Sequence, residues 1–228
     1  MTTTGTTAWS PSIVDMVEEA AERAGFEIRS GYEMRTAIRS LNFLLAEWAN
    51  RGLNLWAIDQ QTVPLVAGTQ SYTLLSDSID LIECELRIAG GDGGYSDIAL
   101  ERKTVSQWAQ IPNKFSQSRP NSYYVQRLEA APVLNLWPVP DSSSYQIVYW
   151  RLRRLQDAGT GVNTLDIPFR FIPALVAGLA YHMAVKKPQI GLDRVQGLKA
   201  MYDEAWQFAA DEDRDRSSFF FVPDDPMS

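Results

Sequence analysis

Few residues in this chain of 228 could carry out acid–base or metal chemistry. It contains one histidine, His182, and one cysteine, Cys84. A zinc site of Cys and His ligands needs several more of each, and a Ser-His-Asp triad would have to use His182, although no GxSxG is present. His182 lies in a strongly apolar helical pattern and Cys84 in a strand pattern, so we expect a hydrogen-bonded core histidine and a packed thiol. We predict no catalytic residue, no cofactor, no metal site and no disulfide framework.

Four carboxylates leave one enzymatic hypothesis open. Glu83 and Glu85 fall on the same face of a predicted strand, and Asp77 and Asp80 stand close by in the sequence. Most glycosidases act through paired carboxylates that flank the sugar bond. The alternative hypothesis is therefore a carbohydrate-binding or cell-wall-degrading protein, with exposed aromatic residues of the β region as its sugar contacts.

Two other stretches resemble ligand sites but favour simpler interpretations. "GGDGG", residues 90–94, lacks the lysine and helix that follow a phosphate-binding loop, so it predicts a hairpin turn. "DEDRDR", residues 211–216, lacks the EF-hand spacing and predicts a solvated helix end with mixed charges.

The densest basic stretch is "RLRR", residues 151–154. On a strand Arg151 and Arg153 share a face, where they could contact phosphate or an acidic partner. The negative charge of the whole chain favours instead a solvated strand edge or salt bridges between subunits.

The stretch "LNLWPVPD", residues 134–141, begins as a strand and then places Trp137 beside two prolines. Pro138 and Pro140 remove two backbone donors, which a central strand needs. We therefore expect this end to lie at a sheet edge, where prolines discourage unwanted strand pairing. Trp137 then either anchors the core of the β region, the interpretation we favour, or faces a neighbouring subunit.

The C-terminal segment is strongly apolar but has no helical period. A free tail with three phenylalanines would be an aggregation hazard. We predict that the tail docks on another chain, with docking on its own helices as the alternative. The residues in question are Phe219, Phe220, Phe221, Val222 and Pro223.

The first fifty residues predict two helices. Ser10 is a suitable N-cap, Pro11 suits the first helical position, and Gly25 can end the helix. Ser30 and Glu33 have the spacing of a capping box for the second helix. Apolar residues recur at steps of three and four on both helices: Ile13, Val17, Ala20 and Ala24 on the first, and Met34, Ile38, Leu41, Leu45 and Trp48 on the second.

The hydrophobic pattern alternates with period two after the second helix. Residues 57–74 predict two strands around a turn at residues 67–69, and residues 79–101 predict a hairpin. Residues 120–141 predict two more strands, and residues 144–155 a strand covered on both faces. Thr104 can cap a short helix within this block, which is large enough for a small core of its own.

The helical period returns from residue 166. Residues 168–188 are apolar around most of the circumference, which predicts a central helix. Residues 190–216 are amphipathic, and their apolar residues define one predicted buried face: Val195, Leu198, Met201, Tyr202, Ala205 and Phe208.

The order of these elements predicts an α+β fold. We expect a four-helix bundle, an antiparallel β domain inserted between its second and third helices, and an extended C-terminal tail. The expected boundaries are a flexible arm at residues 1–9, the helical bundle at 10–55 and 164–216, the β domain at 56–163, and the tail at 217–228.

The composition narrows the function classes. An apolar fraction of 45% supports a packed core, and the seven Trp, nine Tyr and nine Phe suit interfaces. The net charge of −7 argues against binding of nucleic acid through its phosphates, and so disfavours a third hypothesis, a regulatory DNA-binding protein. No apolar run approaches the length of a membrane span, and the N-terminus, neither basic nor apolar, does not read as a secretory signal.

Several motifs, in this order, resemble the phage head-to-tail adaptor family, which includes the tail accessory or packaged-DNA stabilisation proteins of short-tailed phages. They are "QSYTLLSDSIDLIEC", "LERKTVSQWAQIPNK", "SRPNSYYVQRLEAAPVLNLWPVPD", "YQIVYWRLRRLQD" and "PFRFIPALVAGLAYHMAVKKP". Each alone is unspecific, but together with their flanks they extend the resemblance over nearly the whole chain, from about Val14 to Pro223.

The resemblance implies a ring protein, commonly of twelve copies, that lies beneath the capsid portal, extends the DNA channel and joins the capsid to the tail. Its partners would be further copies of itself, the portal protein, and tail or nozzle proteins. Double-stranded DNA would pass without specific binding, and no membrane is involved. The expected location is the neck of the virion, after assembly in the host cytoplasm.

The family carries no catalytic motif to transfer, so the contact residues are our own inference. We expect the phenylalanine tail at the portal or another partner, and we assign four residues to a subunit or tail interface: Arg119, Trp137, Arg151 and Arg153. The enzymatic alternative becomes a virion-associated carbohydrate-binding or cell-wall-degrading protein.

Overall fold

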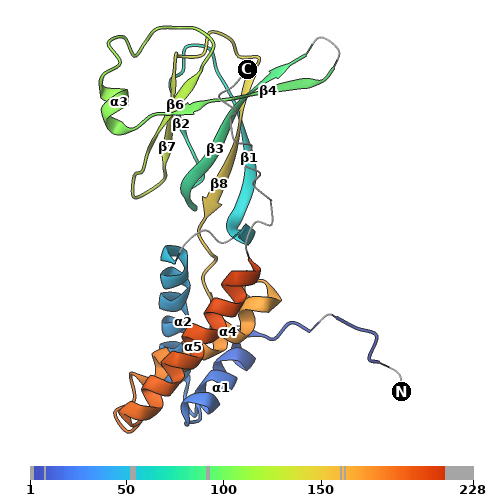
Figure 1. The fold of residues 1–228 in the computed structure, drawn as a ribbon, viewed down its shortest axis with the longest axis vertical. Helices are drawn as coiled ribbons and strands as arrows, with labels where there is room; N and C mark the ends of the chain where they lie inside the picture. Colours follow the sequence, from blue (N-terminus) through green and yellow to red (C-terminus); the bar gives the residue numbers. More distant parts are fainter. Residues whose placement is uncertain are drawn as a thin grey trace, which may run out of the picture. The chain divides into compact units, whose positions relative to one another are not determined.

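The computed structural model describes residues 3–7, 9–51, 55–90, 93–159, 161 and 163–213. Within these ranges the fold is α+β, as predicted, with five α-helices and two four-stranded sheets (Figure 1). The chain separates into two compact units. The helical unit comprises residues 1–50 and 157–228, and the β unit comprises residues 51–156.

The helical unit is organised around its most apolar helix. α4 (Ile172–Ala184) contacts α1 (Ile13–Ala24), α2 (Gly31–Asn50) and α5 (Leu192–Glu212), and it directly follows a 3-10 turn, η2 (Phe169–Phe171) (Figure 1). Nine of the thirteen residues of α4 are buried. The prediction of a central helix is therefore confirmed.

Capping side chains fix where the first two helices begin and end. α1 starts two residues later than predicted, because Ser12 rather than Ser10 is the N-cap and forms a capping box with Asp15. Gly25 ends α1 in the left-handed region, at φ 93°, as predicted. At α2 half of the predicted Ser30–Glu33 box is present, with the Glu33 amide donating to Ser30 Oγ at 3.2 Å. The Glu33 carboxylate accepts from the Arg29 amide, at 2.9 Å.

The predicted buried face of α5 is correct only in part. Leu198 and Tyr202 are buried, whereas Met201 and Phe208 are 59% and 66% exposed. α5 packs mainly on α4 and η2. These two elements cover only part of the apolar face of α5, so the rest of that face is exposed. Asp213, predicted to be solvated, is also buried at the end of this helix.

Aromatic side chains and one polar chain join α2, η2 and α5. The Trp48 ring lies 4.7 Å from that of Trp206 and 5.8 Å from that of Phe171, measured between centroids. Trp48 Nε1 donates to the Tyr202 hydroxyl at 2.8 Å, and this hydroxyl donates to Glu47 Oε1 at 3.2 Å. These contacts hold α5 and η2 against the C-terminal part of α2.

His182 on α4 extends the same series of hydrogen bonds through Glu47. Its Nε2 lies 3.1 Å from Glu47 Oε2. The predicted hydrogen bond is thus confirmed, but the predicted core position is wrong, because the side chain is 27% exposed.

The β unit contains two sheets. The first has the antiparallel order β1-β8-β3-β4, and the second has the order β2-β7-β6-β5, in which only β5 pairs in parallel. η1 (Leu55–Ala57) precedes β1, and α3 (Val105–Ala109) lies between β5 and β6. The strands are β1 (Ile58–Pro64), β2 (Ser71–Thr73), β3 (Ser78–Ala89), β4 (Tyr95–Ala99), β5 (Glu101–Arg102), β6 (Ser122–Gln126), β7 (Val133–Trp137) and β8 (Tyr145–Arg153).

Side chains of both sheets share one core, which includes Leu86 and Ile147 of the first sheet and Leu134 of the second. Cys84 of β3 is buried in it as predicted, and burial raises the pKa of its thiol to about 12. The predicted β3–β4 hairpin is confirmed, with the Gly90 amide donating to the Gly94 carbonyl at 2.8 Å. Positions 91 and 92 of that turn lie outside the described residues.

The edge prediction for the Trp137 stretch is wrong. β7 lies between β2 and β6, so it is an inner strand, and it ends at Trp137 itself. Pro138 and Pro140 come after that last residue and therefore cost the ladder no donor. Beyond the strand, the Val139 amide donates to the Ser116 carbonyl at 2.9 Å.

Candidate functional site

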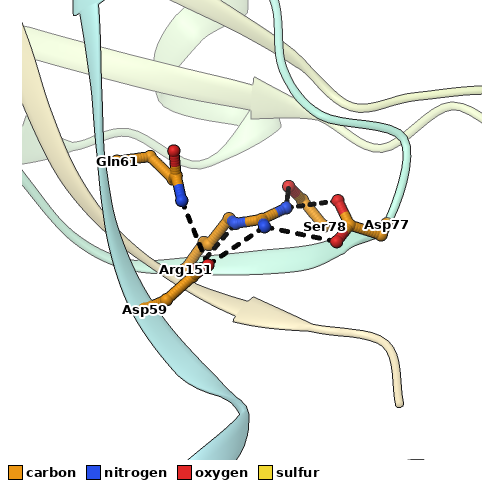
Figure 2. Close-up of polar contacts among 5 residues, drawn as sticks. All are labelled: Asp59, Gln61, Asp77, Ser78 and Arg151. Carbon is orange, nitrogen blue, oxygen red and sulfur yellow. Dashed lines mark hydrogen bonds and ion pairs between the residues drawn. The ribbon is translucent and has the colours of Figure 1, made fainter. Parts of the chain in front are cut away.

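Arg151, a predicted interface residue, lies inside the β unit and is only 4% exposed. Its Nε and Nη2 donate to the Asp59 carboxylate at 2.7 and 3.1 Å. On the other side, Nη1 donates to Ser78 Oγ at 2.9 Å and both Nη groups donate to Asp77 (Figure 2). The guanidinium thus joins β1, the start of β3 and β8 at one end of the first sheet.

The charges in this network stabilise one another. Burial by itself would raise the pKa of the Asp59 carboxyl, but hydrogen bonds from Arg151 and Gln61 outweigh it, so the pKa of Asp59 is lowered. Burial likewise opposes the charge of Arg151, yet the bonds to Asp59 and Asp77 raise the pKa of its guanidinium. Arg151 therefore links strands within the β unit, and its guanidinium donors are used by partners in the same chain.

The other three predicted interface residues lie nearer the surface of the β unit. Arg119 is exposed in the loop before β6, and Arg153 is half-buried near the end of β8. Trp137 is half-buried, and its Nε1 donates to the Asn113 carbonyl at 2.9 Å. An interface role for these three stays a prediction.

Of the four carboxylates in the enzymatic hypothesis, the two aspartates are hydrogen-bonded to arginines and the two glutamates lie on one face of β3. Asp77 is held by Arg151, and Asp80 accepts from Arg102 at 2.8 Å and from Arg127. Glu83 and Glu85 share one face of β3, as predicted, on either side of the inward-facing Cys84. The two aspartates are thus occupied by arginine donors.

An apolar hollow of about 540 Å³ opens on the helical unit between α1 and the start of α4. Trp9 and Phe169 border it and are 73% and 78% exposed. Met16 and Pro173 also line it, together with Arg170. Its volume lies in the range of pockets that bind small ligands or anchor side chains.

A second hollow, of about 340 Å³, lies between α1, α4 and α5 and is lined by Met201 and Phe208, the exposed residues of α5. It shares Arg23 and Pro173 with the first hollow. We call the two together the α1–α4–α5 groove. It is an apolar depression bordered by exposed large side chains.

The predicted docking tail, Phe219 to Pro223, lies outside the described residues. Among the residues that the structure does describe, no three His, Cys, Asp or Glu side chains are grouped as metal ligands. In the same ranges no helix is long and apolar enough to cross a membrane.

Comparison with known protein families decides the class of this protein. The model of the SU10 adaptor protein family matches residues 12–223. The chain belongs to this family. The resemblance to phage head-to-tail adaptors is thereby confirmed, over both units of the fold.

Comparisons with individual proteins add little to this adaptor assignment. No curated protein matches the chain. One similar solved chain comes from a structure described as "Neck of empty GTA particle computed with C6 symmetry", with 9% sequence identity. The match covers 83% of this chain and 88% of that chain at a TM-score of 0.29, which establishes no correspondence of residues.

Membership in the SU10 adaptor family indicates a structural, non-enzymatic role, for which the relevant sites are contact surfaces. The groove has the exposed apolar side chains that contact surfaces use, and the sequence pattern does not reveal it because Met201 and Phe208 fall on the face of α5 that we expected to be buried. The wide arc of apolar positions on α5 indicates that some of them are exposed, but it does not say which.

Proposed function

We propose that this SU10-family adaptor forms a homo-oligomeric ring, expected to hold twelve copies, beneath the portal of a phage capsid. The ring extends the DNA channel and joins the capsid to tail or nozzle proteins, in the neck of a virion assembled in the host cytoplasm. The family match over residues 12–223 is the observation that carries this proposal. In this arrangement the helical unit is a four-helix bundle that carries the β unit as an inserted domain.

The charge of the chain supports a channel role. A net charge of −7 per subunit, multiplied around a ring, gives a wall that repels the phosphates of DNA. A duplex that must slide through a channel is better served by such repulsion than by tight phosphate binding. DNA therefore passes without specific contacts.

The C-terminal tail supports attachment to the portal. Its three phenylalanines and the following Val-Pro form a short apolar segment. In a ring each subunit presents one copy of this segment, so many weak contacts add up to firm attachment through multivalency.

Electron microscopy of the purified protein, alone and mixed with its portal protein, tests the ring. We expect rings that form or stabilise in the presence of the portal. Particles that stay monomeric under both conditions would contradict the proposal.

A co-sedimentation assay with the portal tests the tail. Deletion of residues 217–228 should weaken portal binding, and so should replacement of Phe219, Phe220 and Phe221 by serine in a chain of unchanged length. A truncated protein that binds the portal as well as the intact one would remove the tail from the proposal while leaving the ring standing.

A further inference from the structure

The α1–α4–α5 groove presents a large apolar surface without a described occupant. Trp9, Phe169, Met201 and Phe208 border it and are each more than half exposed. Its lining also carries three arginines and three carboxylates, so net charge selects no partner. Apolar area is what the groove offers, and its occupant must supply matching apolar side chains.

The described part of the chain ends at the edge of this groove. Asp213, the last described residue, is buried and accepts a hydrogen bond from Arg170 Nη2 at 2.5 Å. Arg170 lines the larger hollow. Everything that follows Asp213 in the sequence therefore starts beside the groove.

The sequence beyond Asp213 supplies the required side chains within reach. Phe219 follows Asp213 by six residues, which can span about 20 Å when extended. Phe208 and Met201 lie about 8 and 18 Å back along α5, at the helical rise per residue. Phe219 to Val222 can thus reach both hollows.

The short connection favours the segment of the same chain over that of a second copy. Six residues of flexible chain have a root-mean-square span of about 14 Å. A segment tethered this closely has an effective concentration in the millimolar range, far above that of free subunits in solution.

We propose that, in the unassembled protein, the α1–α4–α5 groove binds residues Phe219–Val222 of the same chain. Each apolar surface then covers the other, which removes the aggregation hazard that either would carry alone. The groove holds the tail until assembly offers it another partner. This binding concerns the free subunit and does not depend on ring formation or on the portal.

Disulfide trapping in the full-length chain tests the proposal. The variants are Met201→Cys with Phe220→Cys, and Phe208→Cys with Phe220→Cys; the groove positions are exposed, so the substitutions should leave the fold intact. Lys199→Cys with Phe220→Cys is the control, because Lys199 is exposed on α5 and does not line the groove. The native Cys84 is buried and its raised pKa keeps it protonated.

The reaction is run at low protein concentration with oxidised glutathione, and products are separated on non-reducing gels and identified by mass spectrometry. We expect disulfides within one chain to form about tenfold faster at both groove positions than at Lys199→Cys, because only groove-bound tails bring the sulfur atoms together. Disulfides mainly between chains would assign the groove to a second copy. Equal rates at all three positions would show that the groove does not hold the tail. Either result overturns the proposal.

Discussion

Replacing Arg151 by methionine tests whether its buried guanidinium holds β1, β3 and β8 together. Methionine keeps much of the apolar stem but donates no hydrogen bond to Asp59, Asp77 or Ser78. Removal of one partner from a fully buried ion pair costs about 3–5 kcal/mol. The side chains of Asp59 and Asp77 are 34% and 48% exposed, so water can solvate part of the abandoned charge. We therefore expect the free energy of unfolding to fall by about 2–3 kcal/mol.

Urea unfolding at pH 7, followed by far-ultraviolet circular dichroism, measures this loss. The matched control is Arg87→Met in the same unit. Arg87 also makes a bidentate ion pair, with Asp97 at 2.8 and 2.6 Å, but this pair is more exposed to solvent. Arg87→Met should therefore lower the free energy of unfolding by clearly less than Arg151→Met does. If Arg151→Met destabilises the protein no more than Arg87→Met, the buried network does not hold this end of the sheet.

A double substitution of the two aspartates separates the loss of hydrogen bonds from the penalty of an unpaired buried charge. When Asp59 and Asp77 are both replaced by asparagine, loss of the Arg151 guanidinium leaves no carboxylate without a counter-ion. Arg151→Met should then cost less than it does in the native background, because much of the single-variant penalty is uncompensated charge. An equal cost in both backgrounds would refute the electrostatic explanation.

Two further predictions concern the helical unit. Gly178→Ala should destabilise it by about 1–3 kcal/mol, because the added Cβ would lie 2.8 Å from a ring carbon of Tyr202. The control Gly197→Ala adds a Cβ that meets open space, so it should be neutral or stabilising in thermal unfolding. Equal effects of the two substitutions would refute the packing argument. A hydrogen bond from Lys187 lowers the pKa of Glu33 to about 2 from its ordinary 4.5, so Glu33 stabilises the fold above about pH 4.5 and loses this effect as the pH falls through 2. Glu33→Gln should thus lower the melting temperature at pH 7, and the difference from the native protein should narrow between pH 4.5 and 2; a gap that stays constant would contradict this.

Local sequence signals were sufficient where the determining contacts are close in the chain. The Ser30 side-chain cap and the Gly25 helix end involve neighbours within a few residues, and both were predicted correctly. The start of α1 was missed because Ser10 and Ser12 are both acceptable caps. Asp15 decides between them, since it lies three residues after Ser12 and completes the box.

The groove could not be predicted in the same way. Helical periodicity places Met201 and Phe208 close to Leu198 and Tyr202, and nothing local distinguishes their environments. Which side of a wide apolar arc is buried depends on where α4 and η2 lie against the helix. Periodicity identifies a helix and its apolar residues but leaves the covered arc undetermined.

The sequence by itself determined the α+β class, the order of helices and strands, and the adaptor family, because period, caps and motif order are properties of the chain read in one dimension. The tertiary structure alone decided the role of Arg151. Its partners Asp59 and Asp77 lie 92 and 74 residues away in the sequence, and only the pairing of β8 with β1 and β3 brings them within hydrogen-bonding distance. A charge can be counted in a sequence, but its partner and its burial are set by contacts between distant segments.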